Sequence, residues 1–300
     1  MRIVVTDTTM SGMAMNPVAG PFERGSKMPE DRLEREIATW RLPDDRRPLL
    51  DRIESMVRPA LFAGHFGVSF TRFVCGFQYH LGGEQDTREL ADLAHVTRND
   101  HILDVCCFLG GPAVQLAHQI GCKVTGVDVS VGTVVAANCI AGIAGLSDLA
   151  RFVAADASSL PFPDASFSVV WCQGSLEHNQ GWLSEFDRVL KSHGRLALTF
   201  QTRGPSAQSP GGPFSRWTLS DLEELLLEMG YKVERAQDIT ERDIEIGWKA
   251  LDRKLTRLEG EFARALGEEW VHQAHRSFHE EIVAMRSGKW GNGRIIAAKT

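Results

Sequence analysis

Acidic side chains recur at the ends of three successive apolar runs in the middle of the chain. Asp104 lies in the first run, Asp128 ends the second, and Asp156 follows the third. Carboxylates accept hydrogen bonds from hydroxyl and amino groups. At the end of a second strand, a carboxylate can hold both hydroxyls of a ribose, as in dinucleotide-binding folds. Three acids in this order favour a nucleoside site over three unrelated surface caps.

A second group of residues that could take part in catalysis follows the fourth predicted strand, where Glu177 and His178 are adjacent. An imidazole titrates near neutral pH and can act as a general base. The carboxylate could orient that imidazole or hold a cationic amine. The alternative is a helix start whose polar side chains cap backbone groups. We predict Glu177 and His178 as catalytic residues that face the substrate.

Aromatic and histidine side chains provide the remaining candidates for substrate binding. We predict that Tyr79 and His80, which precede the core, close over a bound ligand and that Trp217 walls its pocket. Aromatic walls suit a cationic amine or an aromatic substrate. His275 shares one face of a predicted helix with two further histidines. Such a face could bind a metal, but substrate contact is favoured, and we predict no metal site.

The six cysteines do not follow a zinc-binding spacing, and Cys106 and Cys107 are adjacent. We therefore predict reduced thiols in a cytoplasmic protein. Cys107 is an alternative nucleophile, because a helix predicted to start just after it would lower the pKa of its thiol. A small buried residue is the favoured interpretation.

Alternating strands and helices must position these residues. Five short apolar runs between residues 101 and 200 are separated by helical segments, and two further strands are predicted at 231–236 and 294–298. Strands that alternate with helices imply right-handed crossovers and a mostly parallel sheet. The predicted fold class is therefore α/β.

The rest of the chain is predicted to form helices around this sheet. We expect a flexible arm at 1–30, a helical cap at 31–86 and a core at 87–300. The core should contain a helical insertion of one or two long helices at about 239–287, before the last strand. The cap and the insertion should shape the pocket that binds the substrate.

Composition limits the possible partners. The chain has 300 residues and a formal net charge of −6, which gives no electrostatic basis for binding nucleic acid or an anionic membrane. No apolar run approaches the length of a membrane span, and the N-terminus lacks the layout of a secretory signal. We expect a small-molecule acceptor, no nucleic acid and no membrane, and the long C-terminal helices could support a homodimer.

Five segments of the chain resemble the class I S-adenosylmethionine (SAM) methyltransferases. The resemblance is to the small-molecule branch that includes sarcosine/dimethylglycine and ubiquinone/menaquinone methyltransferases. The segments are His80-Leu-Gly-Gly83, Leu103 to Ala113, Gly126-Val-Asp-Val-Ser130, Asp156-Ala-Ser-Ser-Leu-Pro-Phe-Pro163 and Gly288-Lys-Trp-Gly-Asn-Gly-Arg294. The resemblance implies a Rossmann-like, seven-stranded methyltransferase sheet and the transfer of a methyl group from SAM to a nitrogen or oxygen of a small molecule.

The resemblance also implies roles for residues at the ends of four strands. Asp104 and Gly110 would border the methionine portion of SAM, and Asp128 its ribose. Asp156 would accept from the adenine amino group, and Gln173 would line the methyl group. Neighbouring positions assigned to the same site are Val129, Ala157 and Phe108.

The loop after the first strand departs from this branch. The usual pattern is Asp-x-Gly-x-Gly-x-Gly-Gly, and here Cys106 and Phe108 replace the first two glycines. Glycine serves where the backbone approaches a ligand or takes a positive φ. The Phe108 ring could pack into the cap and leave SAM bound, or it could fill the space of the methionine carboxylate. In the second case the fold would use another donor, such as a folate, or would be a non-catalytic binding protein.

Overall fold

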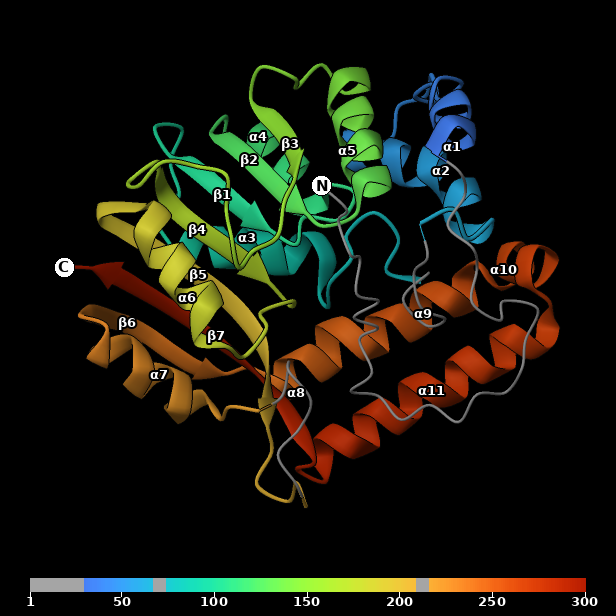
Figure 1. Ribbon diagram of the computed structural model, residues 1–300. Coiled ribbons are helices and arrows are strands. Elements are labelled where there is room, and N and C mark those ends of the chain that lie inside the picture. The colour runs from blue at the N-terminus through green and yellow to red at the C-terminus, as the bar shows by residue number, and fades with distance from the viewer. Residues whose placement is uncertain (1–29, 67–73, 209–215) are drawn as a thin grey trace.

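A seven-stranded sheet forms the centre of the molecule, in the order β3-β2-β1-β4-β5-β7-β6 (Figure 1). The first five strands are parallel, and β7 runs antiparallel to both of its neighbours. The strands are β1 (His101–Val105), β2 (Lys123–Asp128), β3 (Ala150–Ala154), β4 (Phe167–Gln173), β5 (Leu190–Arg203), β6 (Tyr231–Asp238) and β7 (Trp290–Lys299). The predicted α/β, seven-stranded Rossmann-like class is confirmed.

Helices cover both faces of this sheet in the computed structural model, which describes residues 30–66, 74–208 and 216–300. The helices are α1 (Glu30–Ile37), α2 (Leu49–Phe62), α3 (Gly83–Leu93), α4 (Gly111–Gln119), α5 (Val131–Ile143), α6 (Gln180–Val189), α7 (Leu219–Glu228), α8 (Thr240–Asp243), the π-helical segment η2 (Ile244–Trp248), α9 (Lys249–Arg257), α10 (Glu259–Leu266) and α11 (Glu268–Arg286). Apart from residue 30, the arm predicted at 1–30 lies outside the described residues.

Two hydrophobic clusters hold these layers together. One cluster joins α3, α4 and α5 to apolar side chains of α1 and α2, including Leu33 and Ile53. The other lies under α6 and α7 and contains Phe186 and Leu222. The helices of the predicted cap therefore share a continuous core with the sheet. The predicted boundary between residues 86 and 87 falls inside α3, because that helix begins at Gly83, after Gly82 takes a φ of 80°.

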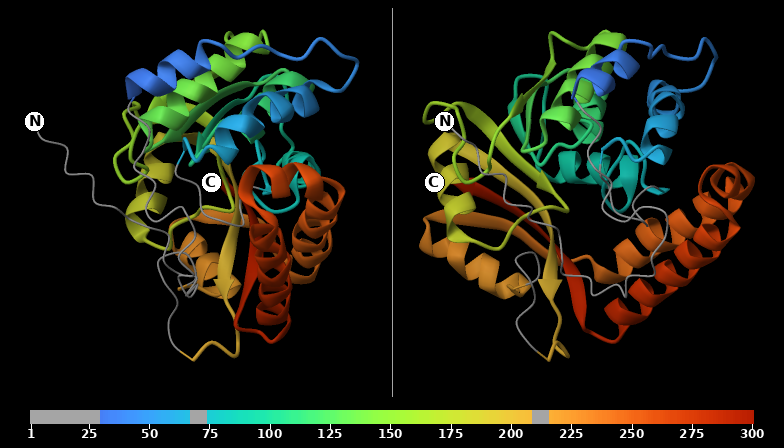
Figure 2. Two further views of the ribbon diagram at one scale, coloured as in Figure 1. Left: turned by 90° about the vertical axis from the view of Figure 1, so that its right-hand side faces the viewer. Right: turned by 45° about the vertical axis from the view of Figure 1, so that its right-hand side comes forward.

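The helical insertion between β6 and β7 is more divided than expected. The one or two long helices predicted at about 239–287 are α8, η2, α9, α10 and α11. A break comes at Gly267, whose φ of 94° lies in a region that side-chain-bearing residues rarely enter. It allows α11 to fold back beside α9 (Figure 2). Among the described residues, no helix is both long and apolar enough to cross a membrane.

Candidate functional site

The loop after β1 crosses the carboxyl end of β2. The Cys107 amide donates to the Val127 carbonyl at 3.0 Å, and the Phe108 amide donates to Oδ2 of Asp128 at 3.0 Å. Cys106, Phe108 and Gly110 have φ values of 60°, 50° and 78°. The backbone thus takes the left-handed conformation at both positions where Cys106 and Phe108 replace a glycine of the related branch. This conformation costs a residue with a side chain about 1–2 kcal/mol.

The Phe108 ring packs toward the cap. Its centroid lies 4.4 Å from the Tyr79 ring and 6.2 Å from the Phe66 ring, and only 9% of the residue is exposed. Of the two arrangements that the sequence allows for this ring, the structure confirms packing into the cap. Tyr79, predicted to close over a ligand, is part of this aromatic group.

Asp104 is a buried acid that lacks full hydrogen bonding. The residue is 2% exposed, and its Oδ2 is buried without a hydrogen-bond partner among the described residues. Burial raises the pKa of Asp104 to about 8, and the nearby charge of Asp128 adds to this effect. A cationic group placed here would stabilise the ionised form of this carboxyl.

Asp128 holds the loop and the start of α5. In addition to the Phe108 amide, it accepts from the Ser130 amide at 2.9 Å through Oδ1. Carboxylate oxygens can accept more than one hydrogen bond each, so these contacts are compatible with ribose binding. The ribose contact stays a prediction.

The ends of β2 and β3 present a partly apolar surface. Val129 is 74% exposed beside Asp128, and Ala157 is buried next to the exposed Asp156. Oδ1 of Asp156 accepts from the Ser158 amide at 2.8 Å and from its hydroxyl at 2.7 Å. The predicted adenine contacts are therefore on adjacent strand ends, and their role stays a prediction.

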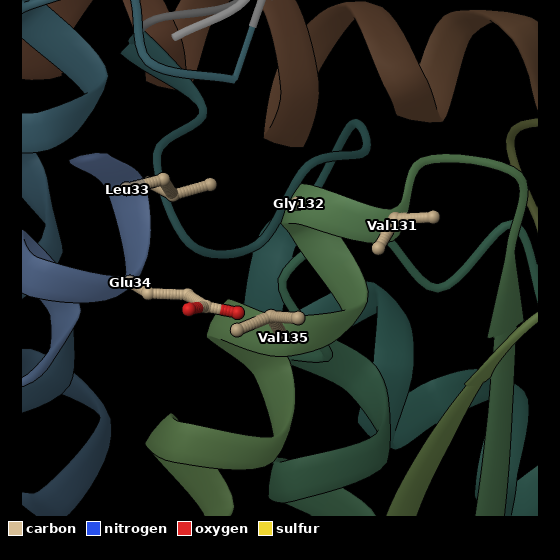
Figure 3. Close-up of a pocket in the computed structure, with 5 residues that line it drawn as sticks. All are labelled: Leu33, Glu34, Val131, Gly132 and Val135. Carbon is tan, nitrogen blue, oxygen red and sulfur yellow. The ribbon is translucent and has the colours of Figure 1, made fainter. Parts of the chain in front are cut away.

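A shallow pocket adjoins this surface, between α1 and the first turns of α5 (Figure 3). Its lining residues are Leu33, Glu34, Val131, Gly132 and Val135. It contains none of the acids at the strand ends, so we do not assign it to the candidate site.

The environment of Cys106 is acidic. Burial is the main cause that raises the pKa of the Cys106 thiol, followed by the Cys172 thiol and then Asp128, Asp104 and Glu177. Glu177 is half-buried, and no described residue donates a hydrogen bond to its carboxylate. The acids that act on the pKa of this thiol thus come from β1, the end of β2 and the segment after β4.

His178 is enclosed by aromatic rings. It is 1% exposed, stacks on Trp217 with centroids 4.8 Å apart, and meets Phe200 edge-on at 5.8 Å. Its Nδ1 accepts a hydrogen bond from the Trp217 amide at 2.8 Å. Burial lowers the pKa of His178 to about 4, so the ring is neutral at pH 7 with its proton on Nε2. The general-base role stays a prediction, but the Nδ1 lone pair is already in use.

Gln173 and His80 belong to a buried polar cluster near α3. The Gln173 Nε2 donates to Oδ2 of Asp86 at 2.5 Å, and its Oε1 accepts from Thr87 at 3.2 Å. Nε2 of His80 is 3.2 Å from the Thr87 hydroxyl, and burial lowers the pKa of His80. Sequence reasoning missed Asp86 and its partner Arg294. The available signal was an arginine directly before the apolar end of the last strand.

His275 takes part in a contact between two helices of the insertion. Its Nδ1 lies 2.5 Å from Oδ1 of Asp252, which joins α11 to α9. Its predicted substrate contact is untested. Within the described ranges, no group of three or more His, Cys, Asp or Glu side chains is suited to a metal ion.

The cysteines are free thiols. Cys107 is buried against Gly126, where an added Cβ would lie 2.9 Å from its Sγ. Burial raises the pKa of Cys107 well above its usual value. This shift opposes the thiolate that a nucleophile needs and favours the packing interpretation.

Comparison with known proteins identifies the family. Residues 103–198 match a family described as a methyltransferase domain. The chain is 33% identical over 181 residues to 27-O-demethylrifamycin SV methyltransferase of Amycolatopsis mediterranei, covering 56% of this chain and 66% of that protein. It is 32% identical over 199 residues to O-methyltransferase resE of Aspergillus sclerotiorum, covering 62% of this chain and 74% of that protein.

A solved structure supports the same assignment at the level of fold. Haemonchus contortus phosphoethanolamine N-methyltransferase 2, in complex with phosphomonomethylethanolamine and S-adenosylhomocysteine, superimposes with a TM-score of 0.69 at 18% identity. The match covers 86% of this chain and 61% of that protein. These relatives give no support to a folate-type donor or to a non-catalytic protein. The chain belongs to the SAM-dependent methyltransferases that act on small molecules.

Proposed function

We propose that this chain transfers the methyl group of SAM to a nitrogen or oxygen atom of a small-molecule acceptor. The observation that carries this proposal is the buried Oδ2 of Asp104, which has no hydrogen-bond partner among the described residues and lies at the strand end beside the Cys106 loop. The charged groups that act most strongly on Cys106, Cys107 and Asp104 are all acidic. Such a site attracts a ligand that carries a sulfonium and an ammonium group.

The strand ends fit the parts of SAM in order. Asp104 and Gly110 would hold the methionine portion, Asp128 the ribose, and Asp156 the adenine. The unpaired, buried Oδ2 of Asp104 supports this fit, because a buried acceptor without a donor is costly unless a ligand supplies one. When bound, SAM supplies an electrophilic methyl group on sulfur.

Glu177 and His178 would act on the acceptor side. Because the Nδ1 of His178 already accepts a hydrogen bond, we assign it the role of an Nε2–H donor to the acceptor instead of the base. Glu177 would hold an ammonium group or take the proton of a hydroxyl. Trp217, stacked on His178, would form part of the pocket wall. The cap at 31–86 and the insertion at about 239–287 would shape the rest.

An assay with methyl-labelled SAM and a panel of amines and phenols tests this function. We expect label transfer by the native protein, and a fall of at least about tenfold in kcat/KM for Glu177→Gln. Glu224→Gln, on the exposed side of α7, is the matched control and should act like the native protein. A larger loss with amines than with phenols would assign a nitrogen acceptor. Equal activity of Glu177→Gln and the control would contradict the role of Glu177.

The cellular setting is proposed on narrower grounds. The free cysteines, several of them buried in the described core, support a reducing compartment such as the cytoplasm. A homodimer through the insertion helices is a hypothesis supported by Val283, a large apolar side chain that is 52% exposed on α11. Sedimentation of the purified protein at several concentrations would test it.

A further inference from the structure

A cluster of buried charges lies between α3, β7 and the first turn of the insertion. Oδ1 of Asp86 is 2.6 Å from Nη2 of Arg294 and 2.8 Å from Nη1 of Arg242. Arg242 also contacts Glu89 through two nitrogens, at 2.8 and 2.5 Å, and Asp243 at 2.9 Å. Asp86, Arg294 and Asp243 are each no more than 5% exposed. We refer to these five residues as the Asp86 network.

A network of buried charges stabilises a fold poorly, because removing the charged groups from water costs free energy. Replacing a buried ion pair by well-packed apolar side chains is often neutral or stabilising. The network contains three acids and two arginines, burial raises the pKa of Asp243 to about 7, and Nε of Arg294 is buried without a hydrogen-bond partner among the described residues. Stability alone therefore does not account for it, and its other contacts indicate what it does.

The network ends on the side chain of Gln173. While Oδ1 of Asp86 binds the two arginines, its Oδ2 accepts from Nε2 of Gln173 at 2.5 Å. At the other end of the same amide, Oε1 accepts from Thr87 and from Nε1 of Trp171, each at 3.2 Å. Donors on one side and a carboxylate on the other fix both the position and the orientation of the amide.

We propose that Asp86, clamped by Arg294 and Arg242, is a positioning residue that holds Gln173 in its place at the carboxyl end of β4. This inference rests on the proposed function, in which Gln173 lines the methyl group of SAM. It extends that function to the insertion, because Arg242 lies on α8 and ties the start of the insertion to Asp86. Small displacements of a group at a reacting centre have large effects on binding and rate.

The chain offers a matched control at the opposite end of the sheet. Asp100 is also a buried acid, 8% exposed, and it accepts from Nη2 of Arg195 at 2.7 Å. No hydrogen bond joins Asp100 to Gln173 or to another candidate site residue within the described ranges. An effect that comes only from breaking a buried Asp–Arg pair should appear equally in Asp86→Asn and Asp100→Asn.

The experiment is a calorimetric titration with SAM of the native protein, Asp86→Asn, Gln173→Ala, the double variant and Asp100→Asn. We expect Asp86→Asn and Gln173→Ala each to weaken SAM binding by about tenfold. The double variant should bind SAM no more weakly than the single variant with the lower affinity for SAM, because both changes act through the Gln173 amide. Asp100→Asn should melt at a lower temperature but bind SAM within about twofold of the native protein.

A spectroscopic readout separates positioning from general destabilisation. The side-chain amide resonances of Gln173, assigned by their loss in Gln173→Ala, should shift in Asp86→Asn and stay unchanged in Asp100→Asn. If Asp86→Asn does not fold, Arg242→Gln replaces it, since this side chain is 22% exposed and its loss loosens Asp86 without removing it. We expect about threefold weaker SAM binding for Arg242→Gln.

Several results would overturn the inference. One is native-like SAM binding by folded Asp86→Asn, and another is additive effects of Asp86→Asn and Gln173→Ala. A third, for the case that Asp86→Asn does not fold, is native-like binding by Arg242→Gln. Each of these results would leave the proposed function in place. Failure of the native protein to bind SAM would overturn the proposed function, and this inference with it.

Discussion

Asp100 and Asp104 stand at the two ends of the same short strand, and their surroundings are opposite. Asp100, just before β1, accepts from the Thr97 amide at 2.8 Å, the Ser168 hydroxyl at 2.7 Å and Arg195 at 2.7 Å. Burial alone would raise the pKa of Asp100, but these hydrogen bonds and the Arg195 charge outweigh it and lower the pKa. Asp104 has a buried oxygen without a partner, and its pKa is raised to about 8.

The contrast indicates that the amino end of the sheet contributes to stability and that the carboxyl end is suited to binding a ligand. At the amino end, the protein supplies every partner that a buried acid needs, so Asp100 stabilises the fold. At the carboxyl end, Asp104 has no such partner for its buried oxygen among the described residues. The loop residues Cys106 and Phe108 there take a left-handed backbone conformation. Unmet hydrogen bonds and strain of this kind are found where a ligand completes the site.

The largest effect should come from Asp104→Asn on ligand binding. Asparagine keeps the shape but cannot ionise, so the variant lacks the carboxylate that would meet the cationic methionine portion of SAM. Hydrogen bonds to charged groups contribute about 1.5–3 kcal/mol, so the Kd for SAM should rise by roughly 10- to 100-fold. Calorimetric titration of the variant measures this change. An unchanged Kd would remove Asp104 from the site.

The same substitution at the other end should act on stability. Asp100→Asn leaves Arg195, whose side chain is 24% exposed, without its carboxylate, and we expect a loss of about 2 kcal/mol, below the cost of breaking a fully buried pair. Because the pKa of Asp100 is lowered, its contribution is present above the usual carboxyl pKa and is lost as the pH falls through the lowered value. Urea unfolding at pH 7 and at pH 3 should show a deficit that shrinks at the lower pH. A constant deficit would contradict this account.

A smaller effect of opposite sign is expected for the stability of Asp104→Asn. Between pH 4 and 8 the folded protein keeps a proton on Asp104 that the unfolded chain has lost, so this group lowers the free energy of unfolding as the pH rises. The variant lacks this penalty. It should be more stable than the native protein by about 1–2 kcal/mol at pH 8.5, after the cost of an unpaired amide, with no gain near pH 4. Destabilisation at pH 8.5 would show that Asp104 is a structural acid like Asp100.

The difference between the two ends also marks what the sequence could and could not reveal. The period and the order of the apolar runs were sufficient to predict the sheet, because strands that alternate with helices form a mostly parallel sheet when their apolar side chains are buried. The acids Asp104 and Asp128 were found because each belongs to a strand end. The sequence could not say which way the Phe108 ring turns, since that depends on Phe66 and Tyr79, which are distant in the chain.

Long-range partners explain the remaining gaps. The Nδ1 of His178 accepts from the amide of Trp217, 39 residues later, so the chain pattern around Glu177 gave no sign of it. Asp86 and Arg294 are 208 residues apart, so no local sequence pattern pairs them. The insertion was predicted as helical, but its divisions depend on single residues such as Gly267.

The most direct test of the central claim, that the carboxyl end of the sheet binds SAM with Phe108 in place, is calorimetry of the native protein with SAM beside Phe108→Gly. The account predicts that the native protein binds SAM and that Phe108→Gly, which loses the ring contacts with Tyr79 and Phe66, binds it no more tightly. An absence of binding by the native protein, with binding by Phe108→Gly, would contradict it by showing that the ring blocks the site.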